Sequence, residues 1–147
     1  MNNQTFLDRN LVSLLEAARD AARNSYSPYS GFKVGAALAL SNGAMVTGTN
    51  VENVSYSLTI CAERAAIARA IAEHGPTIRI VAMAVVNLNN APSPPCGACR
   101  QMLVEFTEPD APVVFAADEG IRTMPLSALL PLAFNTNLKG SRAPEVS

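Results

Sequence analysis

The stretch Phe32–Val51, FKVGAALALSNGAMVTGTNV, decides the architecture of this chain. It holds two apolar runs, Phe32–Leu40 and Met45–Val51, which are joined through Ser41-Asn42-Gly43. An Asn-Gly pair between such runs is a strong β-hairpin signal, because both residues accept the backbone angles of a tight turn. The sequence therefore predicts two antiparallel strands here.

Helices are predicted on both sides of this hairpin. Before it, apolar residues recur at helical spacing over Leu7–Ala22, and Thr5-x-x-Asp8 resembles a capping box at the start. After it, Cys61–Glu73 is rich in alanine and other good helix formers, and Gly75-Pro76 provides a stop signal.

The second half of the chain alternates predicted strands and helices. Ile78–Asn87 is almost wholly apolar, as expected of a central strand that is covered on both faces. Pro94-Pro95 breaks the chain before the next helix. The remaining expected elements are a helix over Cys96–Phe106, strands over Val113–Ala117 and Ile121–Met124, and a short helix over Leu126–Leu130. The order αββαβαββα predicts an α/β fold of three layers, α/β/α, around a mixed sheet of about five strands.

The bulk composition narrows the class of protein. With 147 residues the chain fits one domain, so residues 1–147 are expected to form a single catalytic domain. Lys and Arg number 11 against 12 Asp and Glu, with no run of like charge, so the basic surface of a nucleic-acid binder is missing. No segment has the pattern of a secretory leader or the roughly 20 apolar residues of a membrane span. We expect a cytoplasmic protein that acts on a small molecule, without nucleic acid or membrane partners.

The chain has only three cysteines, in the motifs Cys61-Ala62-Glu63 and Pro95-Cys96-Gly97-Ala98-Cys99. Cys96 and Cys99 are three residues apart, so on the first turn of a helix both sulfurs lie on one face. A closed structural zinc site takes four protein ligands, whereas three leave a position for water. We therefore predict one Zn²⁺ per subunit, held by Cys61, Cys96 and Cys99, with Glu63 as the acid/base group.

The spacing of Cys61 and Glu63 also predicts where the helix begins. Two residues apart, they would point in different directions inside a helix, so the helix must begin at about Cys61. Both ligand groups then lie at helix N-termini, where the helix dipole favours thiolates. Three thiolates and Zn²⁺ carry a net negative charge, and Arg64 is expected to offset it by donating hydrogen bonds to the ligand sulfurs.

These motifs resemble those of the small, homotetrameric class of cytidine deaminases, within the cytidine/deoxycytidylate deaminase superfamily. The segments that carry the resemblance are Tyr26–Ala37, Thr49–Asn53, Cys61–Arg64, Cys96–Gln101 and Leu129–Phe134. The resemblance implies a cytidine deaminase-like fold. It further implies zinc-dependent hydrolysis of cytidine and 2′-deoxycytidine to uridine and 2′-deoxyuridine plus ammonia, in pyrimidine salvage.

The resemblance also implies roles for residues that bind the substrate. Asn50 and Glu52 would bind the ribose 3′-hydroxyl, and the Ala62 backbone N–H would hold the cytosine carbonyl. Phe32 would pack near the nucleoside. Phe134 would reach the site of a neighbouring subunit, so the protein would be a homotetramer whose active sites are shared between subunits.

Two further positions bear on the chemistry that the resemblance implies. Glu63 would take a proton from water, pass it to N3 of the base and later help ammonia leave after attack at C4. Pro94 stands where the family usually has serine or a similar residue. The family contact there is a backbone carbonyl to the substrate amino group, which proline retains.

Other functions stay open at this point. A C-x-x-C pair alone is more often a structural zinc or redox motif, although the added C-A-E motif favours catalysis. A relative acting on another aminated heterocycle, such as an aminonucleoside antibiotic or a free base, is the nearest alternative. A nucleic-acid-editing deaminase and a zinc-stabilised module without activity are the others.

Overall fold

The computed structural model describes residues 3–135, with side chains described from residue 9 onward. Its elements are α1 (Asn3–Ala22), β1 (Val34–Leu40), β2 (Met45–Thr49), the 3₁₀ turn η1 (Tyr56–Leu58), α2 (Ala62–His74), β3 (Ile80–Asn87), α3 (Gly97–Phe106), β4 (Pro112–Ala117), β5 (Gly120–Pro125) and α4 (Leu126–Leu129). Apart from the additional η1, this is the predicted order of helices and strands. The capping box at Thr5 is wrong, because α1 already includes Asn3 and Thr5 therefore lies inside the helix.

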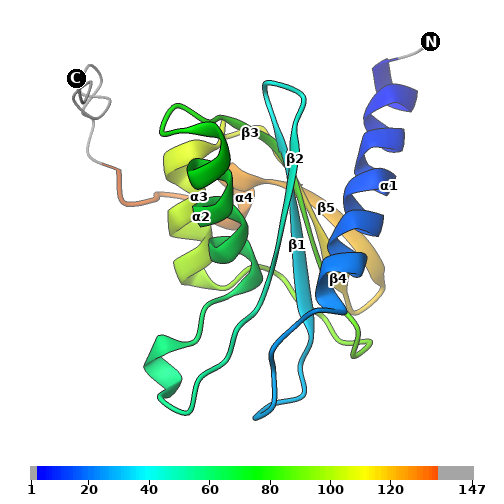
Figure 1. The fold of residues 1–147 in the computed structure, drawn as a ribbon. Coiled ribbons are helices and arrows are strands. Elements are labelled where there is room, and N and C mark those ends of the chain that lie inside the picture. Colours follow the sequence, from blue (N-terminus) through cyan, green and yellow to red (C-terminus); the bar gives the residue numbers. More distant parts are fainter. Residues whose placement is uncertain (1–2, 136–147) are drawn as a thin grey trace.

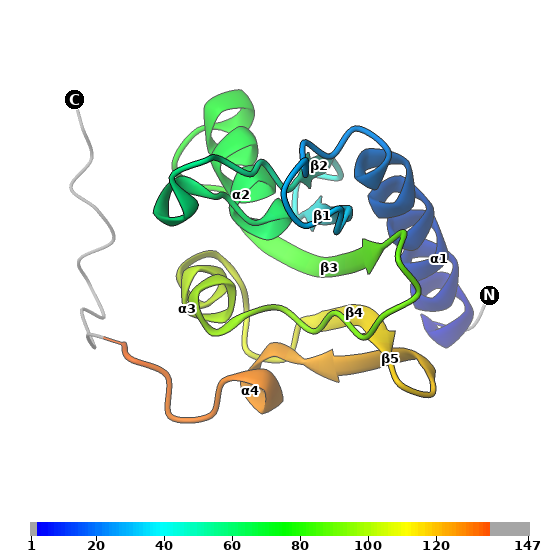
Figure 2. The same ribbon diagram turned by 90° about the horizontal axis from the view of Figure 1, so that it is seen from below.

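The five strands form one mixed sheet in the order β2-β1-β3-β4-β5. β1 is antiparallel to β2 and β3, β3 is parallel to β4, and β4 is antiparallel to β5. Helix α1 covers one face of the sheet, and α2 and α3 lie side by side on the other (Figures 1 and 2). The predicted three-layer α/β/α arrangement is confirmed.

The hairpin predicted from Asn42-Gly43 is present between β1 and β2. Gly43 has φ +88°, a left-handed conformation that glycine adopts without strain. The Gly43 N–H donates to the Leu40 carbonyl at 3.0 Å, and the Leu40 N–H donates to the Ala44 carbonyl at 2.9 Å. These bonds close the turn and fix the register of the first two strands.

Alternate residues of the central strands supply two separate cores. The core under α2 and α3 includes Leu38, Ile67, Met83, Val85, Leu103, Val113 and Phe115. The core under α1 includes Leu14, Ala18, Ala37, Ala84, Val86 and Val114. Because β3 contributes to both, it is the central strand covered on two faces that its apolar sequence predicts.

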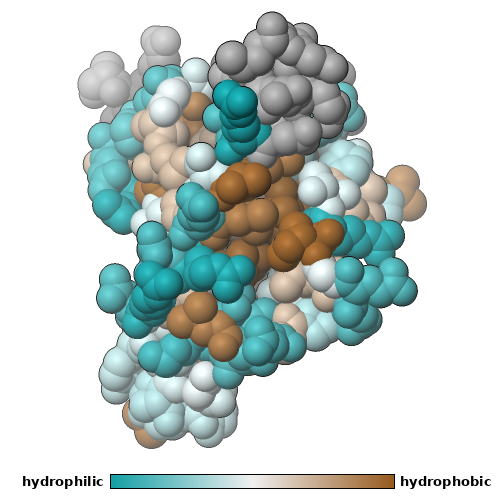
Figure 3. All heavy atoms as spheres, turned by 90° about the vertical axis from the view of Figure 1, so that its right-hand side faces the viewer, coloured by the Kyte–Doolittle hydropathy of each residue, from teal (hydrophilic) through white to brown (hydrophobic). Residues whose placement is uncertain are grey.

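Figure 3 shows apolar side chains gathered on the side of the molecule where α1 lies. Helix α1 packs on β1, β2 and β3. Val12 of α1 and Ile121 of β5 are each 54% exposed.

Between residues 3 and 135, no helix combines the length and hydropathy that crossing a membrane requires.

Gly48 allows β2 to lie against the first turns of α2. A Cβ at position 48 would lie 2.5 Å from the Ala62 carbonyl oxygen and closer still to the Ala66 amide nitrogen. Gly48→Ala should therefore lower the free energy of unfolding by about 1–3 kcal/mol, as overpacking typically does. Denaturant unfolding measures this, with Gly97→Ala as control, because within residues 3–135 a Cβ there meets nothing within 4 Å. Wild-type stability in Gly48→Ala would show that the helix is not held this closely.

Candidate metal centre

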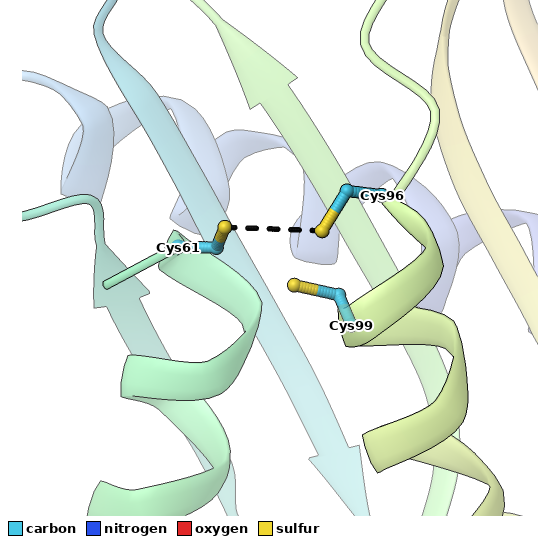
Figure 4. A group of neighbouring side chains, drawn as sticks. All are labelled: Cys61, Cys96 and Cys99. Atoms are coloured by element: carbon cyan, nitrogen blue, oxygen red, sulfur yellow. Dashed lines mark hydrogen bonds between the residues drawn. The ribbon is translucent and has the colours of Figure 1, made fainter. Parts of the chain in front are cut away.

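The three cysteines meet where α2 and α3 begin, with their sulfurs facing one another (Figure 4). Cys61 is the N-cap of α2 and Cys96 is the N-cap of α3, both with extended backbone angles. Cys99 lies in the first turn of α3 and is buried. The helix boundary predicted at about Cys61 is confirmed, and the two motifs, far apart in sequence, come together in space.

The sulfur positions fit a zinc ion. All three Sγ atoms lie within 4.8 Å of one another, and those of Cys61 and Cys96 are 3.9 Å apart. Tetrahedral coordination with Zn–S bonds of about 2.3 Å separates two sulfurs by about 3.8 Å. A disulfide requires about 2.05 Å, so the spacing matches a shared cation rather than a covalent pair. An all-sulfur donor set is also one that zinc accepts.

The charges around the sulfurs favour a thiolate. The hydrogen bond from the Cys99 thiol, helped by the Arg64 guanidinium, lowers the pKa of Cys61 to about 5. Arg64 Nη2 donates to Cys61 Sγ at 3.6 Å, which is the hydrogen bond expected from the sequence. The bond that Cys99 shares with Cys61, together with burial, raises the pKa of Cys99. Arg64 thus favours the thiolate form of Cys61, and a thiolate at this position attracts a cation.

Glu63 lies in the first turn of α2, directly beside the cluster. Only 5% of its surface is exposed, and burial raises the pKa of its carboxyl group, with the Cys61 charge adding to the effect. A carboxyl group whose pKa is raised in this way is suited to taking up and returning a proton.

Ala62 is the first residue of α2 and is fully buried. The N–H groups of the first helical turn have no partner within the helix. The Ala62 N–H is therefore a backbone donor placed between a metal ligand and Glu63.

Asn50 lies just after β2 and ties the preceding loop to the sheet. Its Oδ1 accepts hydrogen bonds from the Val34 N–H at 2.9 Å and from Ser25 Oγ at 2.5 Å. Its Nδ2 donates to the Phe32 carbonyl at 2.8 Å. An asparagine amide has two N–H donors, so one remains for a ligand. Asn50 can therefore fix the backbone of Phe32 and still donate one hydrogen bond.

Glu52 also holds the loop that precedes β1. Its Oε1 accepts the backbone N–H groups of Tyr29 at 3.0 Å and Ser30 at 3.1 Å. The Ser30 side chain and these backbone bonds lower the pKa of Glu52, so its carboxylate is ionised at neutral pH. A carboxylate has lone pairs on two oxygens, and Glu52 is therefore able to accept a hydrogen bond from a hydroxyl group as well.

The two aromatic residues of the predicted site are in different environments. Phe32 is half-buried, and its N–H donates to Ser30 Oγ at 3.0 Å. Phe134 is 79% exposed, and its backbone carbonyl accepts a hydrogen bond from Gln101 Nε2 at 2.8 Å. A large aromatic side chain with this exposure has most of its ring available to another surface.

Asn89 was not identified from the sequence, although its side chain also binds the backbone around Phe32. Asn89 Oδ1 accepts the Lys33 N–H at 2.9 Å, and its Nδ2 donates to the Gly31 carbonyl at 3.0 Å. The side chain thus binds the backbone on both sides of Phe32. An asparagine in a turn after a strand is common, and only the sheet brings this one beside residues more than fifty positions earlier.

Comparisons with known proteins agree with this site. Residues 8–116 match the family described as the cytidine and deoxycytidylate deaminase zinc-binding region. A cytidine deaminase of Halalkalibacterium halodurans is 43% identical over 129 residues, covering 87% of this chain and 95% of that protein. The crystal structure of cytidine deaminase from Burkholderia pseudomallei is 40% identical with a TM-score of 0.75, covering 91% of this chain and 100% of that one.

A third relative gives the same result. The crystal structure of cytidine deaminase from Mycobacterium tuberculosis is 40% identical with a TM-score of 0.75, covering 86% of this chain and 98% of that one. The fold, the matched segment and the converging cysteines together show that this chain belongs to the cytidine and deoxycytidylate deaminase family.

Proposed function

We propose that this protein hydrolyses cytidine and 2′-deoxycytidine to uridine and 2′-deoxyuridine, releasing ammonia. The observation that carries the proposal is the convergence of three cysteine sulfurs at two helix N-termini, with the buried carboxyl group of Glu63 beside them. The relatives named cytidine deaminase support cytidine as the substrate. Pyrimidine salvage in the cytoplasm stays a prediction for this chain.

Cys61, Cys96 and Cys99 would hold one Zn²⁺ per subunit, because their sulfurs already have nearly tetrahedral spacing. When bound, zinc supplies Lewis acidity that makes water nucleophilic at neutral pH. Arg64 supports the set by its hydrogen bond to Cys61 Sγ, which offsets part of the thiolate charge.

Glu63 would carry the proton through the reaction. It accepts a proton as the water oxygen bonds to C4 of the base, and it delivers that proton to N3. It then transfers the second proton of the water to the amino group, the C4–N bond breaks, and ammonia leaves. The net change is cytidine plus water to uridine plus ammonia. Burial raises the pKa of Glu63, which suits a carboxyl group that must release a proton as readily as it accepts one.

The remaining residues would orient the nucleoside. The Ala62 N–H would donate to the cytosine carbonyl, and the Pro94 carbonyl would accept from the amino group. Asn50 would donate its remaining N–H to the ribose 3′-hydroxyl, and Glu52 would accept from it. Phe32, whose backbone Asn50 holds, would pack near the nucleoside.

A turnover assay across five substrates tests the proposal. The purified protein is given cytidine, 2′-deoxycytidine, cytosine, cytidine monophosphate and single-stranded DNA, and ammonia release is measured. We expect turnover of the two nucleosides and little of the other three. Preferred turnover of free cytosine or of single-stranded DNA would contradict the proposal.

Glu52→Gln separates ribose binding from loop support. Glutamine keeps a side-chain oxygen for the Tyr29 and Ser30 N–H groups but loses the charge that strengthens a bond to a hydroxyl. Hydrogen bonds to charged groups contribute about 1.5–3 kcal/mol, so kcat/KM for cytidine should fall roughly 10–100-fold. 3′-Deoxycytidine, which lacks the hydroxyl, should lose far less. Equal losses on both substrates would mean that Glu52 does not bind the ribose.

We also propose that the active unit is a homotetramer with shared sites. Large apolar side chains are exposed along the segment that leads into Cys61, namely Val51, Val54, Tyr56, Leu58 and Ile60. Phe134 is exposed as well. Soluble proteins rarely leave contiguous apolar surface open unless another molecule covers it, and closed symmetric oligomers are the commonest assemblies.

Phe134→Ala should weaken cytidine binding, seen as a raised KM, if its ring completes a neighbour's site. Leu132→Ala is the matched control, because Leu132 is fully exposed in the same segment. Sedimentation is run beside the assay at several protein concentrations. A zinc-loaded monomer that turns over at the tetramer's rate would show that each site is complete within one chain.

A further inference from the structure

The first turn of α3 is held by a side chain outside the cysteine set. Arg100 directly follows Cys99 and is partly buried. Its Nε donates to the Pro95 carbonyl at 2.7 Å, and its Nη1 donates to the Leu129 carbonyl at 2.7 Å. One guanidinium thus connects the residue before Cys96 with the last residue of α4.

The Pro95 carbonyl is an important point of attachment, because the segment before Cys96 has few polar groups. Pro94 and Pro95 have no N–H, so their backbone offers only carbonyl oxygens to the rest of the protein. The preceding backbone bond runs from the Ser93 N–H to the Ala116 carbonyl at 2.9 Å. The hydrogen bond from Arg100 to the Pro95 carbonyl therefore restrains the backbone directly before Cys96.

This restraint acts on the orientation of Cys96. The Pro95 carbonyl belongs to the planar peptide unit that joins Pro95 to Cys96, so holding its oxygen limits rotation of that plane. Cys96 is exposed and precedes the helix, whereas Cys99 is buried within α3. Of these two cysteines, Cys96 therefore depends more on support from outside the helix.

The second bond anchors the guanidinium itself. Leu129 ends α4, and the carbonyl groups in the last turn of a helix have no partner within it. The next residue of α3, Gln101, binds the Phe134 carbonyl. Consecutive side chains of α3 therefore hold both ends of the segment Leu129–Phe134.

We propose that Arg100 is a positioning residue of the metal centre. By holding the Pro95–Cys96 peptide against α4, it sets where Cys96 Sγ lies relative to the other two sulfurs. It also links the first turn of α3 to the segment Leu129–Phe134. The inference rests on the zinc ligands of the proposed function and adds a residue that contacts neither zinc nor substrate.

Arg100→Met tests the proposal, since methionine keeps an unbranched apolar stem but has no donors. Arg79→Met is the matched control, because Arg79 also hydrogen-bonds α3, through the Glu105 carbonyl at its far end, and pairs with Glu108. Three properties are measured on each protein: zinc affinity against a chelator, the visible absorption spectrum of the Co²⁺-substituted protein, and thermal unfolding. The cobalt spectrum reports the geometry of the sulfur ligands and does not require turnover.

We expect Arg100→Met to weaken zinc binding about 10–100-fold, the usual cost of losing a residue that orients a metal ligand. Its cobalt spectrum should also change, while both properties stay at the wild-type level in Arg79→Met. Unchanged zinc affinity and spectrum in Arg100→Met, with only a lower unfolding temperature, would overturn the proposal and leave Arg100 as a support for α4.

If Arg100→Met does not fold, Arg100→Lys provides a second test of the proposal. Lysine keeps the charge but presents its donors from a single nitrogen, so it does not reproduce the geometry in which Nε and Nη1 of the planar guanidinium reach two carbonyls. It should bind zinc several-fold more weakly than wild type and alter the cobalt spectrum, and wild-type behaviour in both would again overturn the proposal. If the wild-type protein bound no zinc, the proposed function would fail instead, so the two failures are distinguishable.

Discussion

Replacing Glu63 with glutamine should lower kcat by at least ~10²–10⁴-fold, the usual contribution of a general acid–base group. Glutamine has the same size and can still form hydrogen bonds, but it cannot accept the proton. Glu63 is not among the three sulfur ligands, so zinc should remain bound at the wild-type level. Steady-state kinetics with cytidine, beside elemental analysis of the same sample, measures both properties.

Glu73→Gln is the matched control for this experiment. Glu73 lies in the last turn of the same helix, is exposed, and pairs with Arg69 at 2.8 Å. Its replacement should leave kcat unchanged. Near-normal turnover in Glu63→Gln would refute the role of Glu63 as the proton carrier.

Replacing any one of the three cysteines with alanine should remove both zinc and activity. The cluster offers three protein sulfurs, and a zinc centre reduced to two protein ligands loses most of its affinity. Cys96→Ala is the cleanest of the three variants, because Cys96 is exposed and its loss opens no cavity. Zinc content is measured by elemental analysis after gel filtration. Full zinc occupancy in any of these variants would contradict the ligand assignment.

The Cys96→Ala variant should remain folded. Cys96 is exposed and belongs to neither hydrophobic cluster, so the sheet and its helices keep their packing in this variant. Circular dichroism and thermal unfolding check this for Cys96→Ala. Unfolding on loss of zinc would instead indicate a zinc-stabilised module, in which metal binding and folding are one event.

The sequence is sufficient to predict the order of the elements, because each is encoded by local signals. Asn42-Gly43 specifies the hairpin, and the apolar run before Asn87 specifies a strand buried on both faces. The ends of the elements are predicted less accurately. The apolar run places Phe32 in the first strand, but the Asn50 side chain takes its carbonyl and β1 begins at Val34.

Some residues of the candidate site can likewise be predicted from the sequence, and others cannot. Cys61 with Glu63, and Cys96 with Cys99, are short motifs whose spacing along the chain is enough to predict shared chemistry. Asn89 and Arg100 cannot be found in that way, because their partners are brought to them by the sheet and by α4. Gly31 is 58 positions from Asn89, and Leu129 is 29 positions from Arg100. Support of this kind depends on tertiary packing, for which a single sequence has no local signal.

Removal and return of zinc tests most directly whether the three-cysteine centre deaminates cytidine. The purified protein is stripped with a chelator, cytidine turnover is measured, and Zn²⁺ is then added back in steps up to and beyond one equivalent per chain. We expect turnover to disappear with the metal and to return in proportion to added zinc, reaching a plateau at one equivalent. Undiminished turnover by the stripped protein, or no turnover of cytidine by the fully zinc-loaded protein, would contradict the assignment.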